Sequence, residues 1–89
     1  MKISTHSKEY YAFLRLLRLL REESGITQVE LAKSLEITQS HLSKFERGEL
    51  RIDLVQLRKI CVVLGSSLPA FVNRWEVELS KKANNRKTK

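Results

Sequence analysis

The chain carries apolar residues at the three- and four-residue spacing of amphipathic helices, and none of its segments alternates apolar and polar residues as a half-buried strand would. The first helical pattern spans roughly residues 8–24. Its buried stripe is expected to consist of Tyr10, Phe13, Leu14, Leu17 and Leu20. Later patterns are separated by Gly25, Gly48, Gly65 and Pro69. The spacing therefore predicts an all-α protein.

Capping residues mark where the remaining predicted helices begin. Thr27 and Glu30 form the capping box of a short second helix, in which each side chain accepts a hydrogen bond from the other residue's backbone N–H. After a two-residue connection, Thr38 caps a third helix that ends just before the second glycine. Asp53 caps a fourth helix and Ser67 a fifth, whose first turn tolerates a proline. The buried face predicted for the fourth helix consists of Leu54, Leu57, Ile60, Cys61 and Leu64.

Five helices with short connections predict one compact all-α bundle over residues 1–80, with its core at about 13–75. Residues 81–89 are polar and are expected to form a disordered basic tail. They hold five positive charges of a net charge of +7, which leaves +2 for residues 1–80. The alternative for this tail is a flexible arm that adds non-specific affinity for nucleic acid.

The third predicted helix has one apolar side, formed by Ile37, Leu42 and Phe45. Its other side carries small or amide side chains and one amine, with His41 at the edge, and lacks a carboxylate: Gln39, Ser40, Ser43 and Lys44. Glutamine pairs with an adenine edge, lysine with guanine acceptors and serine with either, so this face has the chemistry of major-groove reading. A merely solvated polar face is the alternative.

Three segments in register decide between these interpretations. GITQVELA at 25–32, TQSHLSKFERG at 38–48 and LRKICVVLG at 57–65 resemble the Cro and phage-repressor family of helix-turn-helix proteins, also called the Xre family. The resemblance extends over about residues 13–75. It implies a lambda-repressor-like bundle whose second and third helices form the helix-turn-helix motif. It also implies sequence-specific binding of double-stranded DNA, usually as a two-fold dimer that regulates transcription.

The resemblance also implies roles for single residues. Gln39 and Ser40 match the positions that touch the first bases, and Lys44 matches a base-reading position one turn further along, where a phosphate contact or a solvated lysine is the alternative. Gln28 matches a glutamine that holds a phosphate, with an ordinary first-turn residue as the alternative. Further expected contacts to the DNA backbone or its flank are Thr38, His41, Ser43, Arg47 and Arg51, of which Arg51 could equally be a plain surface charge.

Arg21 and Glu46 correspond by resemblance to an internal ion pair between the first helix and the end of the third. Such a pair, partly buried, fixes orientation more than it adds stability, because desolvation offsets much of the attraction. Two exposed charges of little consequence are the alternative. We expect the pair, because it compensates a carboxylate that would otherwise face DNA.

Apolar residues outside the main stripes depart from the family pattern. Leu16 and Leu19 on the first helix, and Trp75 and Leu79 on a long fifth helix, are predicted either to enlarge the core or to form a dimer surface. The sequence leaves both possibilities open.

Several classes of protein are disfavoured by the composition. Cys61 is the only cysteine and is expected in the core, so no intrachain disulfide is possible. His6 and His41 with one cysteine cannot supply a metal site, and no cofactor is implied. No nucleophile–base arrangement or phosphate loop is present, so we expect no enzymatic activity. The longest apolar run, residues 60–64, is too short for a membrane span.

The sequence thus favours a cytoplasmic, bacterial or phage-encoded transcription regulator, nucleoid-associated when bound. We expect a repressor that acts as a homodimer on an inverted repeat. Two alternatives on the same fold remain: an antitoxin whose main partner is a protein toxin, and an adaptor that binds proteins instead of DNA.

Overall fold

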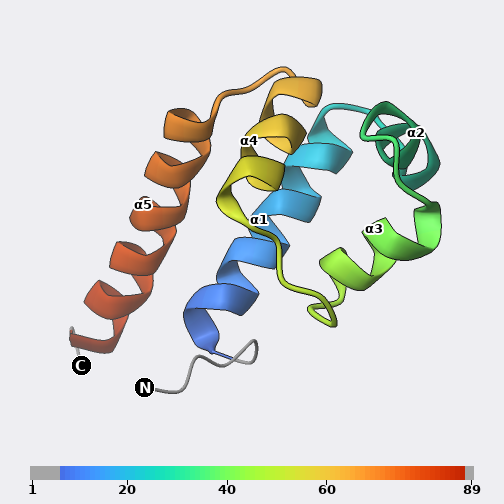
Figure 1. Cartoon of the computed structure of the whole chain (residues 1–89). Helices are drawn as coiled ribbons and strands as arrows, with labels where there is room; N and C mark the ends of the chain where they lie inside the picture. Colours follow the sequence, from blue (N-terminus) through green and yellow to red (C-terminus); the bar gives the residue numbers. More distant parts are fainter. Residues whose placement is uncertain (1–6, 88–89) are drawn as a thin grey trace.

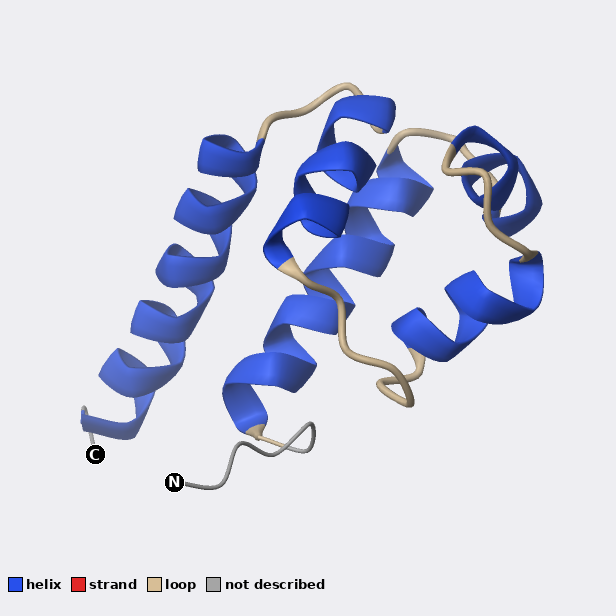
Figure 2. Cartoon of the chain, viewed as in Figure 1, coloured by secondary structure: helices blue, strands red, loops and turns tan. Residues whose placement is uncertain are grey.

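A computed structural model describes residues 7–87 of the chain, with side chains up to Lys81. This part forms five helices, with no other regular structure (Figure 2). They are α1 (Lys8–Glu23), α2 (Gln28–Ser34), α3 (Gln39–Glu46), α4 (Leu54–Val63) and α5 (Leu68–Lys87). In Figure 1, α5 lies on the left and α2 and α3 lie on the right, with α1 and α4 between them. The predicted all-α five-helix bundle is therefore confirmed.

The predicted caps are present. The Thr27 hydroxyl accepts a hydrogen bond from the Glu30 N–H at 3.1 Å, and the Glu30 carboxylate accepts one from the Thr27 N–H at 2.9 Å. The hydrogen bond from the Thr27 backbone N–H, together with a smaller effect of the Thr27 side chain, holds the pKa of the Glu30 carboxyl below its usual value. Asp53 forms a second capping box with Gln56 at 2.8 and 2.9 Å, and the Ser67 hydroxyl accepts a hydrogen bond from Ala70. The helix starts are thus fixed by local side-chain chemistry.

The core lies where α1 meets the other helices. Three of the five residues of the predicted α1 stripe are buried, and the other two, Tyr10 and Leu20, are partly buried against them. The buried core consists of Phe13, Leu14, Leu16, Leu17, Leu31, Ala32, Leu42, Phe45, Leu57, Ile60, Cys61, Leu64 and Phe71. Burial raises the pKa of the Cys61 thiol, as expected for a small core residue. Gly48 lies against this core with φ +80°, and a Cβ there would stand 3.1 Å from Leu14 Cδ1. A side chain at this turn would meet both an unfavourable backbone conformation and a packed neighbour.

The four apolar residues that could either enlarge the core or form a dimer surface differ in how deeply they are buried. Leu16 is buried, and Trp75 packs its ring against Phe13 while its indole N–H donates to the Glu9 carbonyl at 3.0 Å. Leu79 is half-buried, and Leu19 stays 42% exposed. Leu16 and Trp75 therefore enlarge the core, as one of the two interpretations predicted.

Two expectations from the sequence differ from the structure. Leu54 was predicted on the buried face of the fourth helix, but it is 66% exposed, because it lies on the first turn of α4, where no element covers it. The helix α5 continues to Lys87, into the segment expected to be a disordered tail. No glycine or proline follows Pro69, so nothing in the sequence stops the helix. Residues 88–89, like His6, lie outside the described residues.

Candidate nucleic-acid interface

Helices α2 and α3 are joined by a tight turn that presents the polar face of α3 to solvent. Glu36 occupies this turn with φ +60°, a left-handed conformation that is costly for a residue with a side chain. The Ile37 N–H donates to the Ala32 carbonyl at 3.0 Å and closes the turn. Leu42 and Phe45 anchor α3 in the core. The opposite side chains are exposed or half-buried, as predicted: Gln39, Ser40, His41, Ser43 and Lys44.

A buried ion pair connects α1 to the end of this helix. Arg21 Nε donates to Glu46 Oε2 at 2.8 Å and Nη2 donates to Oε1 at 3.3 Å. The two side chains are only 11% and 6% exposed. Arg21 Nη1 also donates to the Ile26 carbonyl at 3.1 Å, in the loop before α2. The pair expected from the resemblance is present, and it fixes α3 relative to α1 in a fork-like geometry.

Two glutamine amides extend this ion pair to the exposed face. Gln28 Nε2 donates to Glu46 Oε1 at 2.9 Å, and Gln28 Oε1 accepts from Gln39 Nε2 at 3.3 Å. A carboxylate only accepts hydrogen bonds, so Glu46 determines which way the Gln28 amide points. That orientation leaves the Gln28 oxygen facing Gln39. We call the four residues Arg21, Glu46, Gln28 and Gln39 the amide relay.

The sequence did not reveal the relay beyond its ion pair. Gln28 was expected to hold a phosphate and Gln39 to read a base, but nothing indicated that the two amides bond to each other. The contact joins residues 11 positions apart. The only signal was that both glutamines directly follow a threonine N-cap, and so begin neighbouring helices.

The first turn of α3 is free of acidic side chains. The Thr38 hydroxyl accepts a hydrogen bond from the His41 N–H at 3.0 Å, so its oxygen is used for capping. The His41 ring lies edge-on to Phe45, with centroids 4.8 Å apart, and covers an apolar edge of the helix. The positive end of the helix dipole therefore faces outward beside Gln39 and Ser40 without a compensating carboxylate.

Arg47, expected to contact phosphate, is already paired. Its guanidinium donates to the Glu49 carboxylate at 2.9 and 3.2 Å, and Nη1 donates to the Ser43 hydroxyl. The pair raises the pKa of Arg47 and lowers the pKa of Glu49. Both side chains are more than half exposed, at 55% and 54%, so water and salt weaken their attraction. The sequence analysis did not single out Glu49.

Arg51 is positioned by an aromatic ring of α1. Its guanidinium carbon lies 4.7 Å from the centre of the Tyr10 ring. The Tyr10 hydroxyl accepts a hydrogen bond from the Ile52 N–H at 3.2 Å. Tyr10 thus holds the loop of residues 47–53 against α1, next to the end of α3.

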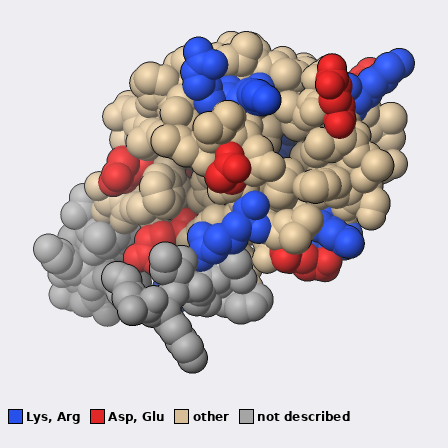
Figure 3. Space-filling model, in the orientation of Figure 1, with Lys and Arg blue, Asp and Glu red and all other residues tan. Residues whose placement is uncertain are grey.

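The surface charge is mixed. On the face shown in Figure 3, basic and acidic side chains are scattered among wide uncharged areas and form no single basic patch.

Within residues 7–87, no group of histidine, cysteine and acidic side chains is arranged to hold a metal ion. In the same part of the chain, no single helix is long and apolar enough to cross a membrane, although α4 and residues 68–81 of α5 pass that test as a pair bent by 103°.

The comparisons with known proteins agree with this geometry. A family model described as helix-turn-helix matches residues 17–71. An Xre-family-like protein from Pseudomonas syringae pv. tomato is 37% identical with a TM-score of 0.76, over 82% of this chain and 89% of that one. The clp gene regulator ClgR from Corynebacterium glutamicum is 25% identical with a TM-score of 0.76, over 90% of this chain and 85% of that one. A search of curated proteins gives no match.

Proposed function

Because the chain belongs to the Xre family of Cro/C1-type helix-turn-helix proteins and is a DNA-binding transcription regulator, we propose that it reads a specific operator with the outward face of α3. The amide relay is the observation that carries this proposal. It holds Gln39 in place before DNA arrives, so less side-chain entropy is lost on binding.

Three side chains of α3 read bases in this proposal. Gln39 has its amide oxygen and one N–H still available, which suits the two hydrogen-bonding positions of adenine in the major groove. Ser40 lies beside it on the first turn, and Lys44 lies one turn further along the same exposed face.

The remaining contacts hold the DNA backbone. Gln28 keeps one amide N–H for a phosphate while the other bonds to Glu46. Arg47 and Arg51 flank the end of α3 and bind phosphates of the neighbouring strand segment. Three further side chains contact the backbone or its flank: Thr38, His41 and Ser43.

We further propose a homodimer that represses transcription from an inverted repeat in the cytoplasm. Two copies related by a two-fold axis present two α3 helices to successive major grooves, about 34 Å apart. The mild charge of residues 1–80 supports a regulator whose specificity comes from base contacts more than from general attraction to DNA.

Selection of bound sequences from a random pool of duplex DNA tests this function. We expect an inverted repeat whose half-sites share two or three defined base pairs. Gln39→Ala should relax the preference at one of these base pairs, which corresponds to about 1–3 kcal/mol of discrimination. Asn73→Ala, which removes an exposed amide from α5, is the matched control and should leave the selected sequence unchanged. A pool that shows no enriched sequence would refute the proposal.

A further inference from the structure

An apolar groove lies where α1, α4 and α5 meet. It has a volume of about 240 Å³, and its walls include Tyr10, Phe13, Leu57, Phe71 and Trp75. Asp53 is the single charged residue that lines it in the described part of the chain, and this carboxylate is engaged in capping α4. The groove is thus an open apolar surface, and covering it lowers the free energy of the protein in water.

One exposed apolar side chain lines this groove, and two others lie close to it in the sequence. Leu54 lines it, yet is 66% exposed, and the neighbouring Val55 is also largely exposed. Leu50 is a third exposed apolar residue, in the loop just before α4. An apolar side chain that projects next to an apolar groove marks a contact surface more specifically than scattered exposed residues do.

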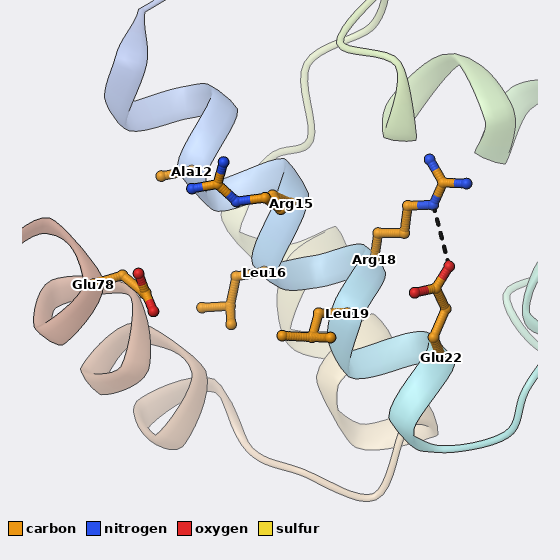
Figure 4. Close-up of a pocket in the computed structure, with 7 residues that line it drawn as sticks. All are labelled: Ala12, Arg15, Leu16, Arg18, Leu19, Glu22 and Glu78. Atoms are coloured by element: carbon orange, nitrogen blue, oxygen red, sulfur yellow. Dashed lines mark ion pairs between the residues drawn. The ribbon is translucent and has the colours of Figure 1, made fainter. Parts of the chain in front are cut away.

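A second groove, on the other side of α1, is a poorer contact surface. Its floor includes Leu16 and Leu19, but four charged side chains surround it (Figure 4). They are Arg15, Arg18, Glu22 and Glu78. Covering that groove would remove water from these charges, which costs free energy unless each one is paired.

We propose that the apolar groove between α1, α4 and α5 is the contact surface for a second copy of this chain, with Leu54 of each copy entering the groove of the other. This inference rests on the proposed two-fold binding of DNA. In a two-fold contact, a residue that projects from one copy meets the groove of its partner, and the reverse contact follows from symmetry. Both parts are present side by side in one chain. An apolar cavity of roughly 150 Å³ admits benzene, so a groove of about 240 Å³ has room for a leucine side chain.

The position of the groove favours a second copy over other occupants. The loop of residues 47–53, which carries Arg47 and Arg51, leads directly from α3 to Leu54. A partner seated at Leu54 therefore fixes the direction of one α3 relative to the other, as reading two half-sites requires. Among the described residues no basic side chain lines the groove itself, while the Arg51 guanidinium lies 4.7 Å from the centre of the ring of Tyr10, one of its walls.

The chain contains its own reporter for this contact. Trp75 is the only tryptophan and lines the groove. We expect its emission to move to shorter wavelength as the protein concentration rises, while sedimentation shows a mass approaching that of a dimer.

Leu54→Ser removes an exposed side chain and should weaken dimerisation by about 100-fold, since two leucines lose their contacts in each dimer. Val62→Ser is the matched control, because Val62 is 56% exposed at the other end of the same helix, and it should behave as the wild type.

Binding to a full operator and to a half-site separates this inference from the proposed function. We expect Leu54→Ser to bind a half-site as the wild type does, but to lose cooperativity on the full site. A Leu54→Ser protein that dimerises normally would refute the contact. A wild type that stays monomeric, with short-wavelength emission at all concentrations, would also refute it, because the chain itself would then cover the groove. If the wild type dimerises through Leu54 but binds neither DNA, the contact stands and the proposed function fails.

Discussion

Replacing Arg21 by alanine tests whether the buried ion pair has the role that the geometry indicates. The substitution removes both hydrogen bonds to Glu46 and the one to the Ile26 carbonyl. It leaves a carboxylate that is only 6% exposed, with Gln28 as its remaining donor. Breaking a buried pair from one side costs about 3–5 kcal/mol.

That cost is large for a chain of this size. Small domains are stable by roughly 5–15 kcal/mol in total, and 1 kcal/mol shifts the melting temperature of such a domain by about 4–8 °C. We therefore expect the Arg21→Ala protein to melt at least about 12 °C below the wild type, measured by circular dichroism. Arg18→Ala is the matched control, because it removes an arginine from the same helix whose pair with Glu22 is exposed. The control should change stability by less than about 0.5 kcal/mol.

A double variant separates stability from positioning. Replacing Arg21 and Glu46 together by methionine removes the uncompensated charge, so most of the lost stability should return. The affinity for the operator should not return, because Gln28 has lost the carboxylate that orients its amide toward Gln39. The reasoning is refuted if Arg21→Ala melts as the Arg18→Ala control does, or if the double variant binds the operator as tightly as the wild type.

Two further predictions concern the turns on either side of α3. Glu36→Gly should raise stability by roughly 0.5–1 kcal/mol in a urea titration, because glycine adopts the left-handed conformation without steric cost. Lys33→Gly, in the exposed last turn of α2, should instead lower stability, by up to about 1 kcal/mol. A stability loss in Glu36→Gly would contradict the assignment of strain to that turn. Glu49→Gln removes the carboxylate that Arg47 leaves when it contacts a phosphate and should raise DNA affinity by up to about fivefold, whereas Glu76→Gln, on exposed α5, should not. Equal affinities for the two variants would exclude the competition between carboxylate and phosphate.

Most of the fold could be predicted from the sequence because its helix boundaries are chemically local. A hydroxyl or carboxylate at an N-cap accepts a hydrogen bond from the backbone N–H three residues later. The helix starts at Thr27, Thr38 and Asp53 can therefore be predicted without knowledge of the tertiary structure. The exposure of Leu54 could not be read in the same way. Its spacing to Leu57 is that of a buried face, and only the arrangement of neighbouring helices shows that nothing covers the first turn of α4.

The candidate site shows the same division. The resemblance to the Xre family placed Arg21 opposite Glu46, and the exposed residues of α3 follow from helical spacing. The bonds from Glu46 to Gln28 and from Gln28 to Gln39 depend on the side-chain conformations of residues brought together by the fold. The pairing of Arg47 with Glu49 likewise depends on the turn around Gly48, whose positive φ reverses the chain after α3.

The two ion pairs at the end of α3 contribute to DNA binding in different ways because their exposure differs. Arg21 and Glu46 are almost completely shielded from water, so salt changes their attraction little and the orientation of the amide relay is retained at any ionic strength. Arg47 and Glu49 are half exposed, so Arg47 can exchange a carboxylate for a phosphate at little cost. It follows that salt should change how tightly the protein binds DNA without changing which base Gln39 prefers. Comparing the sequences selected at low and high salt distinguishes this arrangement from one in which general attraction to DNA positions the reading helix, because in that case the preference itself would fade as salt rises.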